Sequence, residues 1–254
     1  MTTTDPSWNC LETIYATDLV YVPDCWKLCG DAHCCNFARH KSKFRVMART
    51  HSQEIPLLPG EFEYMNSKGW LAQFGDFDHN VVKYELPSVT LRAESIISRR
   101  PNCACDHATR PLICRLYPLM PVFDLAGRCI GTERLGIYEE LEDLAQQVTA
   151  CELRSLPFEQ MTDFLTITTA LGSVPTFLYY LEAYRLTKAH VRERVAAAMG
   201  EDRNAFATFE ALFLRRRAVD HSVLKPQLET LYQTFASRFG ASFVEAMNGT
   251  TTAA

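Results

Sequence analysis

The residues of this chain best suited to chemistry are its cysteines, which are unevenly spread. Seven of the ten lie in two short segments, CWKLCGDAHCC at 25–35 and CACDHATRPLIC at 103–114. Thiolates bind structural zinc and iron–sulfur clusters, and unligated thiols at this density would be an oxidation liability. The clustering therefore predicts a metal site. The ligand candidates are Cys25, Cys29, Cys34, Cys35, Cys103, Cys105 and Cys114.

The spacing within the first segment restricts how its thiols can be used. Cys25 and Cys29 are four residues apart, so on a helical turn they would share one face, and a loop could also direct both at one ion. Cys34 and Cys35 are adjacent, so their side chains point in well-separated directions and rarely complete one tetrahedral site. Either one of them packs without metal, or the two bind different metal ions or different irons of one cluster. The C-x3-C-x4-C-C pattern matches neither the C-x2-C pair of zinc fingers nor the cysteine run of bacterial ferredoxins.

Basic and rigid residues surround the last cysteine of the second segment. Arg110 and Arg115 place positive charge beside Cys114, and such charge lowers the pKa of a thiol and partly neutralises a site of several thiolates. Pro111 and Pro118 stiffen the backbone on either side. The residues expected to surround the ligands are Arg110, Arg115, Tyr117 and His107.

The number of thiols bears on the identity of the metal. One zinc ion takes four ligands, which is fewer than the clustered cysteines of this chain. Either two metals bind, or one iron–sulfur cluster with four cysteine ligands leaves thiols to spare. We favour iron, as a cluster, over zinc, and His107 could add a nitrogen ligand to either.

Taken together, the two segments resemble the YkgJ-type cysteine-cluster family, whose members are described as zinc- or iron-chelating domains. The resemblance covers roughly residues 22–120 and implies metal binding. Here the first gap between cysteines is three residues rather than the common two, and either Cys103 or Cys105 replaces the family's cysteine ahead of Arg-Pro. The matching positions are Cys25, Cys29, Cys34, Cys35, Arg110, Pro111, Cys114, Arg115, Tyr117 and Pro118.

The overall composition is that of a globular protein. Of the 254 residues, 47% are hydrophobic and 22% charged, and a formal net charge of -4 gives no basic excess for nucleic acid. The first residues lack a secretory pattern, and no apolar run reaches the roughly 18 residues of a membrane helix. We therefore expect a cytoplasmic protein without nucleic-acid or membrane partners. Its thiols would stay reduced there, with Cys10, Cys129 and Cys151 simply buried.

The elements that must position the cysteines change in character along the chain. Up to residue 130 the pattern is irregular, with a short helix at 60–72, strands at 10–22 and 80–86, and a hairpin at 121–133. Beyond it, apolar stripes with helical spacing predict helices. The predicted fold is α+β, mainly α. An irregular cysteine-rich metal-binding domain at 1–130 packs on a helical bundle at 131–246, ahead of a disordered tail at 247–254. The predicted helices span 136–151, 158–171, 175–200, 202–219 and about 228–243.

Two functional classes fit these features. In the first, the protein binds iron or zinc through its clustered thiolates. In the second it is an iron-dependent modifying enzyme, either resembling the bacterial lysine N-methylases that modify flagellin, which carry a similar Cys-Cys segment, or acting on a small molecule. Its pocket would lie between the two domains, where ligand sites are common, and no catalytic residue is assigned. Candidates to line it are Tyr179, Tyr180, Arg185 and His190.

Overall fold

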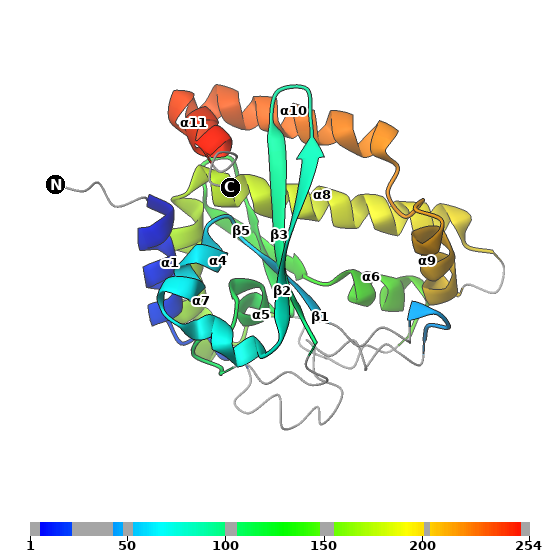
Figure 1. Ribbon diagram of the computed structural model, residues 1–254, viewed down its shortest axis with the longest axis horizontal. Helices are drawn as coiled ribbons and strands as arrows, with labels where there is room; N and C mark the ends of the chain where they lie inside the picture. Colours follow the sequence, from blue (N-terminus) through cyan, green and yellow to red (C-terminus); the bar gives the residue numbers. More distant parts are fainter. Residues whose placement is uncertain are drawn as a thin grey trace.

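A computed structural model describes residues 6–21, 43–47, 53–99, 106–147, 155–200 and 204–249, and all structural statements below concern these residues. Helices and antiparallel strands occur together and helix predominates, which confirms the α+β, mainly α prediction (Figure 1). Six of the seven clustered cysteines in that prediction lie outside the described residues, so its cysteine-rich metal domain stays a prediction.

The larger sheet has three antiparallel strands in the order β1-β3-β2. The strands are β1 (Gln53–Leu57), β2 (Phe77–Glu85) and β3 (Thr90–Ser98), and β2 and β3 form a long hairpin with Val82 opposite Ala93 and Tyr84 opposite Leu91. The strand predicted at 80–86 is therefore confirmed. Because successive side chains of a strand point to opposite faces, these two pairs share one face of the sheet.

The predicted hairpin at 121–133 is confirmed as β4 (Leu119–Phe123) and β5 (Cys129–Arg134). Its turn uses Gly127 at φ +78, a conformation that favours glycine. A Cβ at Gly127 would lie 2.1 Å from the carbonyl oxygen of Gly172, so the turn packs backbone to backbone against the end of the helix that contains Gly172.

The strand expected at 10–22 is wrong, because residues 6–16 form a helix, α1 (Pro6–Ala16). The buried residues Leu11, Ile14 and Tyr15 recur at helical spacing and pack into the core. Tertiary packing of that stripe outweighs the strand preference of the β-branched and aromatic residues in it.

The other elements of the first half are short helices. The helix predicted at 60–72 occurs as two pieces, separated where Gly69 adopts φ +73. These are α4 (Glu61–Ser67) and the 3-10 helix η2 (Trp70–Phe74), and a further helix, α5 (Leu112–Leu116), carries Cys114.

The predicted helices of the second half are confirmed, with changes at their ends. The last one is interrupted at Gly240, where φ is +69. Residues 247–249 continue the second piece, and Met247 is fully buried, so the predicted start of the disordered tail at 247 is wrong. The elements are α6 (Ile137–Leu144), η3 (Phe158–Gln160), α7 (Met161–Gly172), α8 (Pro175–Ala198), α9 (Ala205–Leu214), α10 (His221–Phe239) and α11 (Ala241–Gly249).

Two hydrophobic clusters hold these elements together. The larger includes Leu11, Ile96 and Met120 from the first half and Phe177 from the second, so the two predicted domains share one core. The smaller cluster surrounds Phe44 with side chains of α6, α8 and α9. The boundary predicted at residue 130 falls within β5, and the division into two domains stays a prediction.

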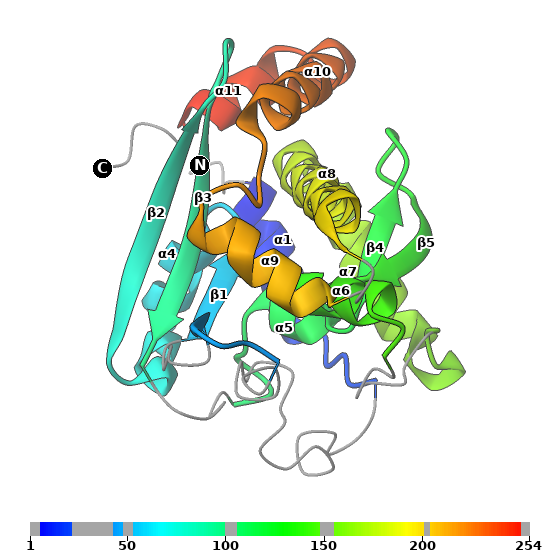
Figure 2. The ribbon, with the colours of Figure 1, turned by 90° about the vertical axis from the view of Figure 1, so that its right-hand side faces the viewer.

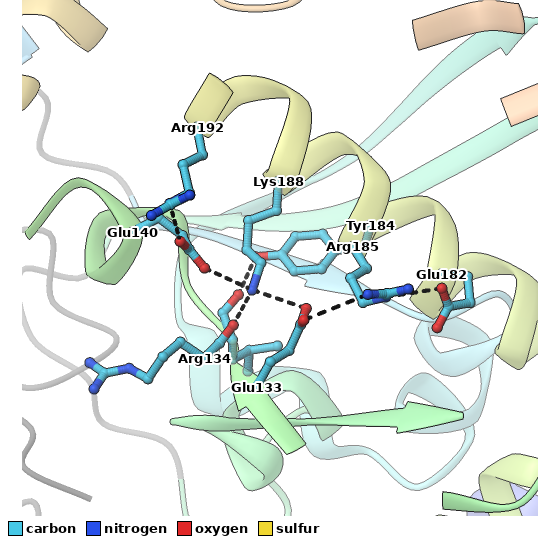
Figure 3. Close-up of polar contacts among 9 residues, drawn as sticks. Glu133, Arg134, Glu140, Glu182, Tyr184, Arg185, Lys188 and Arg192 are labelled. Carbon is cyan, nitrogen blue, oxygen red and sulfur yellow. Dashed lines mark hydrogen bonds and ion pairs between the residues drawn. The ribbon is translucent and has the colours of Figure 1, made fainter. Parts of the chain in front are cut away.

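A buried lysine of α8 joins that helix to β5 and α6 (Figure 3). Lys188, with 5% of its side chain exposed, lies 3.2 Å from Glu133 of β5 and 3.2 Å from Glu140 of α6. It also donates to the backbone carbonyl of Arg134. The more exposed Arg192 reaches the same Glu140 at 3.0 Å. Because paired charges are the form in which buried ions are stable, this network fixes α8 on β5 and α6.

Among the helices described, none is by itself long and apolar enough to cross a membrane, although Phe158–Gly172 and Pro175–Ala198, bent by 104° between them, reach that length and composition as a pair.

Candidate functional site

Cys114 on α5 is the only predicted metal ligand within the described residues, and its thiol is free and half-buried. No three His, Cys, Asp or Glu side chains of the described parts of the chain group as a metal site. Cys10 is buried, as expected, and Cys129 is half-buried. The positions outside the described residues are Cys25, Cys29, Cys34, Cys35, Cys103, Cys105 and Cys151.

A buried carboxylate fixes the first turn of α5. Glu61 has no exposed surface and accepts hydrogen bonds from the backbone N–H of Leu112 at 2.7 Å and of Leu58 at 2.8 Å. The hydroxyl of Tyr15 donates to the same carboxylate at 2.7 Å. Burial raises the pKa of Glu61, against the opposing effect of these donors. Glu61 therefore joins α1 and α4 to the first turn of α5, the helix that carries Cys114.

Arg115, the residue after Cys114, is buried with 1% of its surface exposed. Its guanidinium donates to the backbone carbonyls of Thr17 at 2.8 Å and of Arg110 at 3.3 Å, and also to that of Ala108. It lies 4.9 Å from the centre of the Tyr15 ring, a cation–π distance. Arg115 thus ties the end of α1 to the loop that precedes α5. Whether its charge also neutralises thiolates stays a prediction.

Arg110 makes a second tie between the same two stretches of chain. Its guanidinium donates to the backbone carbonyl of Leu19 at 3.2 Å. Leu19 lies six residues before Cys25, and Arg110 lies four residues before Cys114. The chain just before the first cysteine segment is therefore hydrogen-bonded to the second cysteine segment.

The remaining residues predicted to surround the ligands lie on either side of α5. His107 is partly buried in the preceding loop, and its burial, together with the nearby charge of Arg110, lowers its pKa. Tyr117 follows α5 and donates its hydroxyl hydrogen to the carboxylate of Glu139 on α6. The side chain of Tyr117 is thus engaged with the helical half.

The chain that follows the first cysteine segment is also anchored. The carboxylate of Glu210 on α9 accepts from the backbone N–H groups of Arg45, Val46 and Met47 at 2.8–3.1 Å. Phe44 beside them packs on Phe206 and on further aromatic rings. Sequence reasoning missed this contact, because a single glutamate on an apolar helix carries no signal for the loop that it binds.

An apolar cavity of about 350 Å³ lies beside α5, at the junction of the two halves. Figure 2 shows the β2–β3 hairpin on one side and α8 on the other, with α10 above and α5 below. The sheet contributes the paired side chains Val82 with Ala93 and Tyr84 with Leu91. Leu112, Ile113 and Leu116 of α5 line the opposite end, so the helix that carries Cys114 also forms part of the cavity wall.

The helices present one face each to this cavity. Five residues of α8 line it, and four of them, Tyr180, Ala183, Tyr184 and Thr187, have the i, i+3, i+4 and i+7 spacing of a single helix face, with Leu181 beside them. On α10 they are His221, Leu224 and Leu228, with a similar spacing.

This cavity corresponds in position to the pocket predicted between the two halves. Only one of the four residues predicted to line that pocket lines the cavity. Tyr180 lines the cavity. Tyr179 is core and donates to the carbonyl of Leu228 at 3.3 Å. Arg185 pairs with Glu182 at 3.0 Å, and His190 accepts from the backbone N–H of Asp220 at 2.9 Å.

Comparison with protein-family models, curated proteins and solved structures gives no match for this chain. The resemblance of the two cysteine segments to the YkgJ-type family therefore stays a prediction from their motifs.

Proposed function

We propose that this protein binds a metal in the cytoplasm, as an iron–sulfur cluster or else as zinc, through cysteine thiolates from residues 25–35 and 103–114. Clustered thiolates with nearby arginines are suited to either metal form. Cys114 suits a ligand role because its thiol is free, half-buried and held on a short, firmly anchored helix.

The observation that carries this proposal is a pair of hydrogen bonds from two arginines to the stretch of chain that directly follows α1. Arg110 binds the carbonyl of Leu19, and Arg115 binds that of Thr17. Cys25 lies six positions after Leu19, and an extended chain of that length spans at most about 20 Å. The first cysteine segment therefore begins a short length of chain away from a residue that is hydrogen-bonded to the second segment, which supports ligands from both.

The chain on the other side of Cys114 gives similar support. Asp106 is anchored through its backbone N–H to the side chain of Gln73 at 3.1 Å. Cys105 precedes Asp106 directly, and Cys103 precedes it by three residues. The chain next to both cysteines is therefore anchored at Asp106, in the loop that leads to α5. Either thiol can serve as the ligand ahead of Arg-Pro.

The test is elemental analysis with anaerobic absorbance spectra of the full chain and of three variants. Cys29→Ala and Cys114→Ala are expected to lower the metal content per chain and to destabilise the fold, since metal binding and folding are coupled. Cys129→Ala is the matched control, because that thiol is also free and half-buried but lies outside both segments. Unchanged metal content in Cys29→Ala and Cys114→Ala would overturn the proposal. Broad absorbance at about 400 nm would indicate an iron–sulfur cluster. A colourless protein that contains zinc would indicate the other form.

The second candidate is an iron-dependent modifying enzyme, which the cavity beside α5 favours. Ile113, next to Cys114, lines that cavity, so the short helix that would hold the metal also bounds a space for a small molecule. An enzyme needs an open coordination position. Spectra of the iron-loaded protein that respond to an added small molecule would support this candidate, and spectra that respond to none would reject it.

A further inference from the structure

The walls of the cavity beside α5 leave little for a polar ligand to bind. Seven of its lining side chains are polar, and each already has a protein partner among the described residues. Tyr180 accepts from the backbone N–H of Arg92 at 3.1 Å, and Tyr184 donates to the carbonyl of Leu135 at 2.9 Å. The others are Glu61, Tyr84, Glu94, Thr187 and His221. Because a polar ligand would leave its own groups unpaired there, the cavity suits a hydrocarbon.

The two ends of the cavity differ in exposure. Val82 is 50% exposed, and the nearby hydroxyl of Tyr84 lies 2.7 Å from Nδ1 of the exposed His221. At the other end, Leu112 and Leu116 are 1% and 0% exposed. The cavity therefore has a mouth between β2 and the start of α10, and a closed floor against α5.

A positive charge stands at this mouth. The ammonium group of Lys225 lies 5.0 Å from the centre of the Tyr84 ring. Lys225 has no ion-pair partner in the part of the chain that the structure describes. The carboxylates elsewhere in the wall are engaged, since Glu94 lies 3.2 Å from His79 and 3.7 Å from Arg92. An anionic group at the mouth would therefore find an available cation, whereas one deeper inside would meet carboxylates.

We propose that this cavity binds a medium-chain fatty acid, with the carboxylate at the mouth near Lys225 and the methyl end toward Leu112 and Leu116. At roughly 30 Å³ for a water-sized group, a volume of 350 Å³ holds about a dozen methylene groups, a chain like that of laurate. This proposal does not depend on the metal site, since none of its contacts involves a cysteine.

The test is isothermal titration of the full chain with laurate, dodecanol and octanoate. Each buried methylene strengthens binding by about fourfold, so laurate should bind at least tenfold more tightly than octanoate. Lys225→Gln should lower the affinity for laurate about threefold and leave the affinity for dodecanol unchanged. Arg238→Gln, which removes an exposed cation near the other end of α10, is the control and should change neither. Absence of laurate binding, or equal affinity for laurate and octanoate, would overturn the proposal.

Two substitutions that fill the cavity test its location. Ala93→Trp adds a large ring from the sheet, where Ala93 is exposed toward the cavity, and Ala183→Phe adds one from α8. Each should weaken laurate at least tenfold, and circular dichroism identifies the variants that remain folded. Val81→Trp, one residue from Val82 but on the opposite face of the sheet, is the control and should bind as the parent does. Normal laurate binding by either folded cavity-filling variant would place the ligand elsewhere and overturn the proposal.

Discussion

The carboxylate of Glu61 lies 2.7 Å from the backbone nitrogen of Leu112, so a side chain of α4 holds the first turn of α5. The same carboxylate receives the hydroxyl hydrogen of Tyr15 from α1. Cys114 and Arg115 follow within that short helix. A five-residue helix is too short to be stable alone. The position of Cys114 therefore depends on buried polar contacts made by its neighbours.

Replacing Glu61 with glutamine should destabilise the protein by about 2 kcal/mol. The amide group of glutamine would turn a donor toward one of the backbone N–H groups that now meet a carboxylate oxygen, and an unsatisfied buried donor costs about 1–3 kcal/mol. Chemical denaturation of both proteins measures the difference. Glu63→Gln on the exposed side of the same helix is the control and should stay within about 0.5 kcal/mol. Equal effects of the two substitutions would contradict this role for Glu61.

Arg115→Lys should also be strongly destabilising, although it keeps the charge. The guanidinium reaches carbonyls both just after α1 and in the loop before α5, and a lysine ammonium cannot reproduce that planar set of donors. We expect a loss of about 3 kcal/mol, because several buried carbonyls lose their donor.

Thermal and urea unfolding measure the effect of Arg115→Lys. The control is Arg128→Lys, whose side chain is 80% exposed and pairs with Asp124 at 2.7 Å. An exposed pair of this kind contributes only about 0–1 kcal/mol. A loss for Arg115→Lys no larger than that of the control would show that the carbonyl contacts matter little.

Much of the helical half could be predicted because each helix carries its own apolar stripe. In α8, Phe177, Leu181, Val191 and Val195 are all buried, as their spacing indicates. The N-terminal helix could not be predicted in this way. Ile14 and Tyr15 are residue types common in strands, and only their packing against the rest of the core selects the helix.

The candidate site was harder to predict for a different reason. Its contacts join residues far apart in the sequence, such as Arg110 with Leu19 and Tyr84 with His221. The sequence predicts that Arg115 lies near thiolates, but nothing local indicates that its donors point to backbone carbonyls. The cavity likewise arises only where the sheet and α8 meet, so its lining residues carry no common motif.

The buried lysine of α8 provides a third prediction. Lys188→Met should cost about 3 kcal/mol, because it leaves Glu133 and Glu140 without their shared cation. Arg192→Met removes the other cation bound to Glu140, but 48% of the arginine side chain is exposed, so its loss should cost less than about 1 kcal/mol. Urea unfolding of the two variants compares them on the same helix. Similar losses would mean that burial does not set the strength of these pairs.

The contact between Glu210 and the chain after the first cysteine segment predicts a pH dependence. Desolvation opposes ionisation of this carboxyl, but the backbone N–H groups of Met47, Arg45 and Val46 outweigh it and lower the pKa of Glu210. A carboxyl whose pKa is lower in the folded state contributes stability that is present above its unfolded pKa, about 4.3, and is lost as the pH falls through the folded value. At pH 7, Glu210→Gln should therefore be less stable than the parent by about 2 kcal/mol, the strength of hydrogen bonds to a charged group.

The difference in free energy of unfolding between the parent and Glu210→Gln should narrow as the pH is lowered toward 3, because protonation removes the charge from the parent as well. Urea unfolding at a series of pH values measures it, with Glu245→Gln on the exposed face of α11 as the control that shows no such convergence. A gap that stayed constant with pH would mean that the charge of Glu210 does not hold residues 45–47. Because those residues follow the first cysteine segment, the result also bears on how firmly that end of the segment is anchored to the helical half.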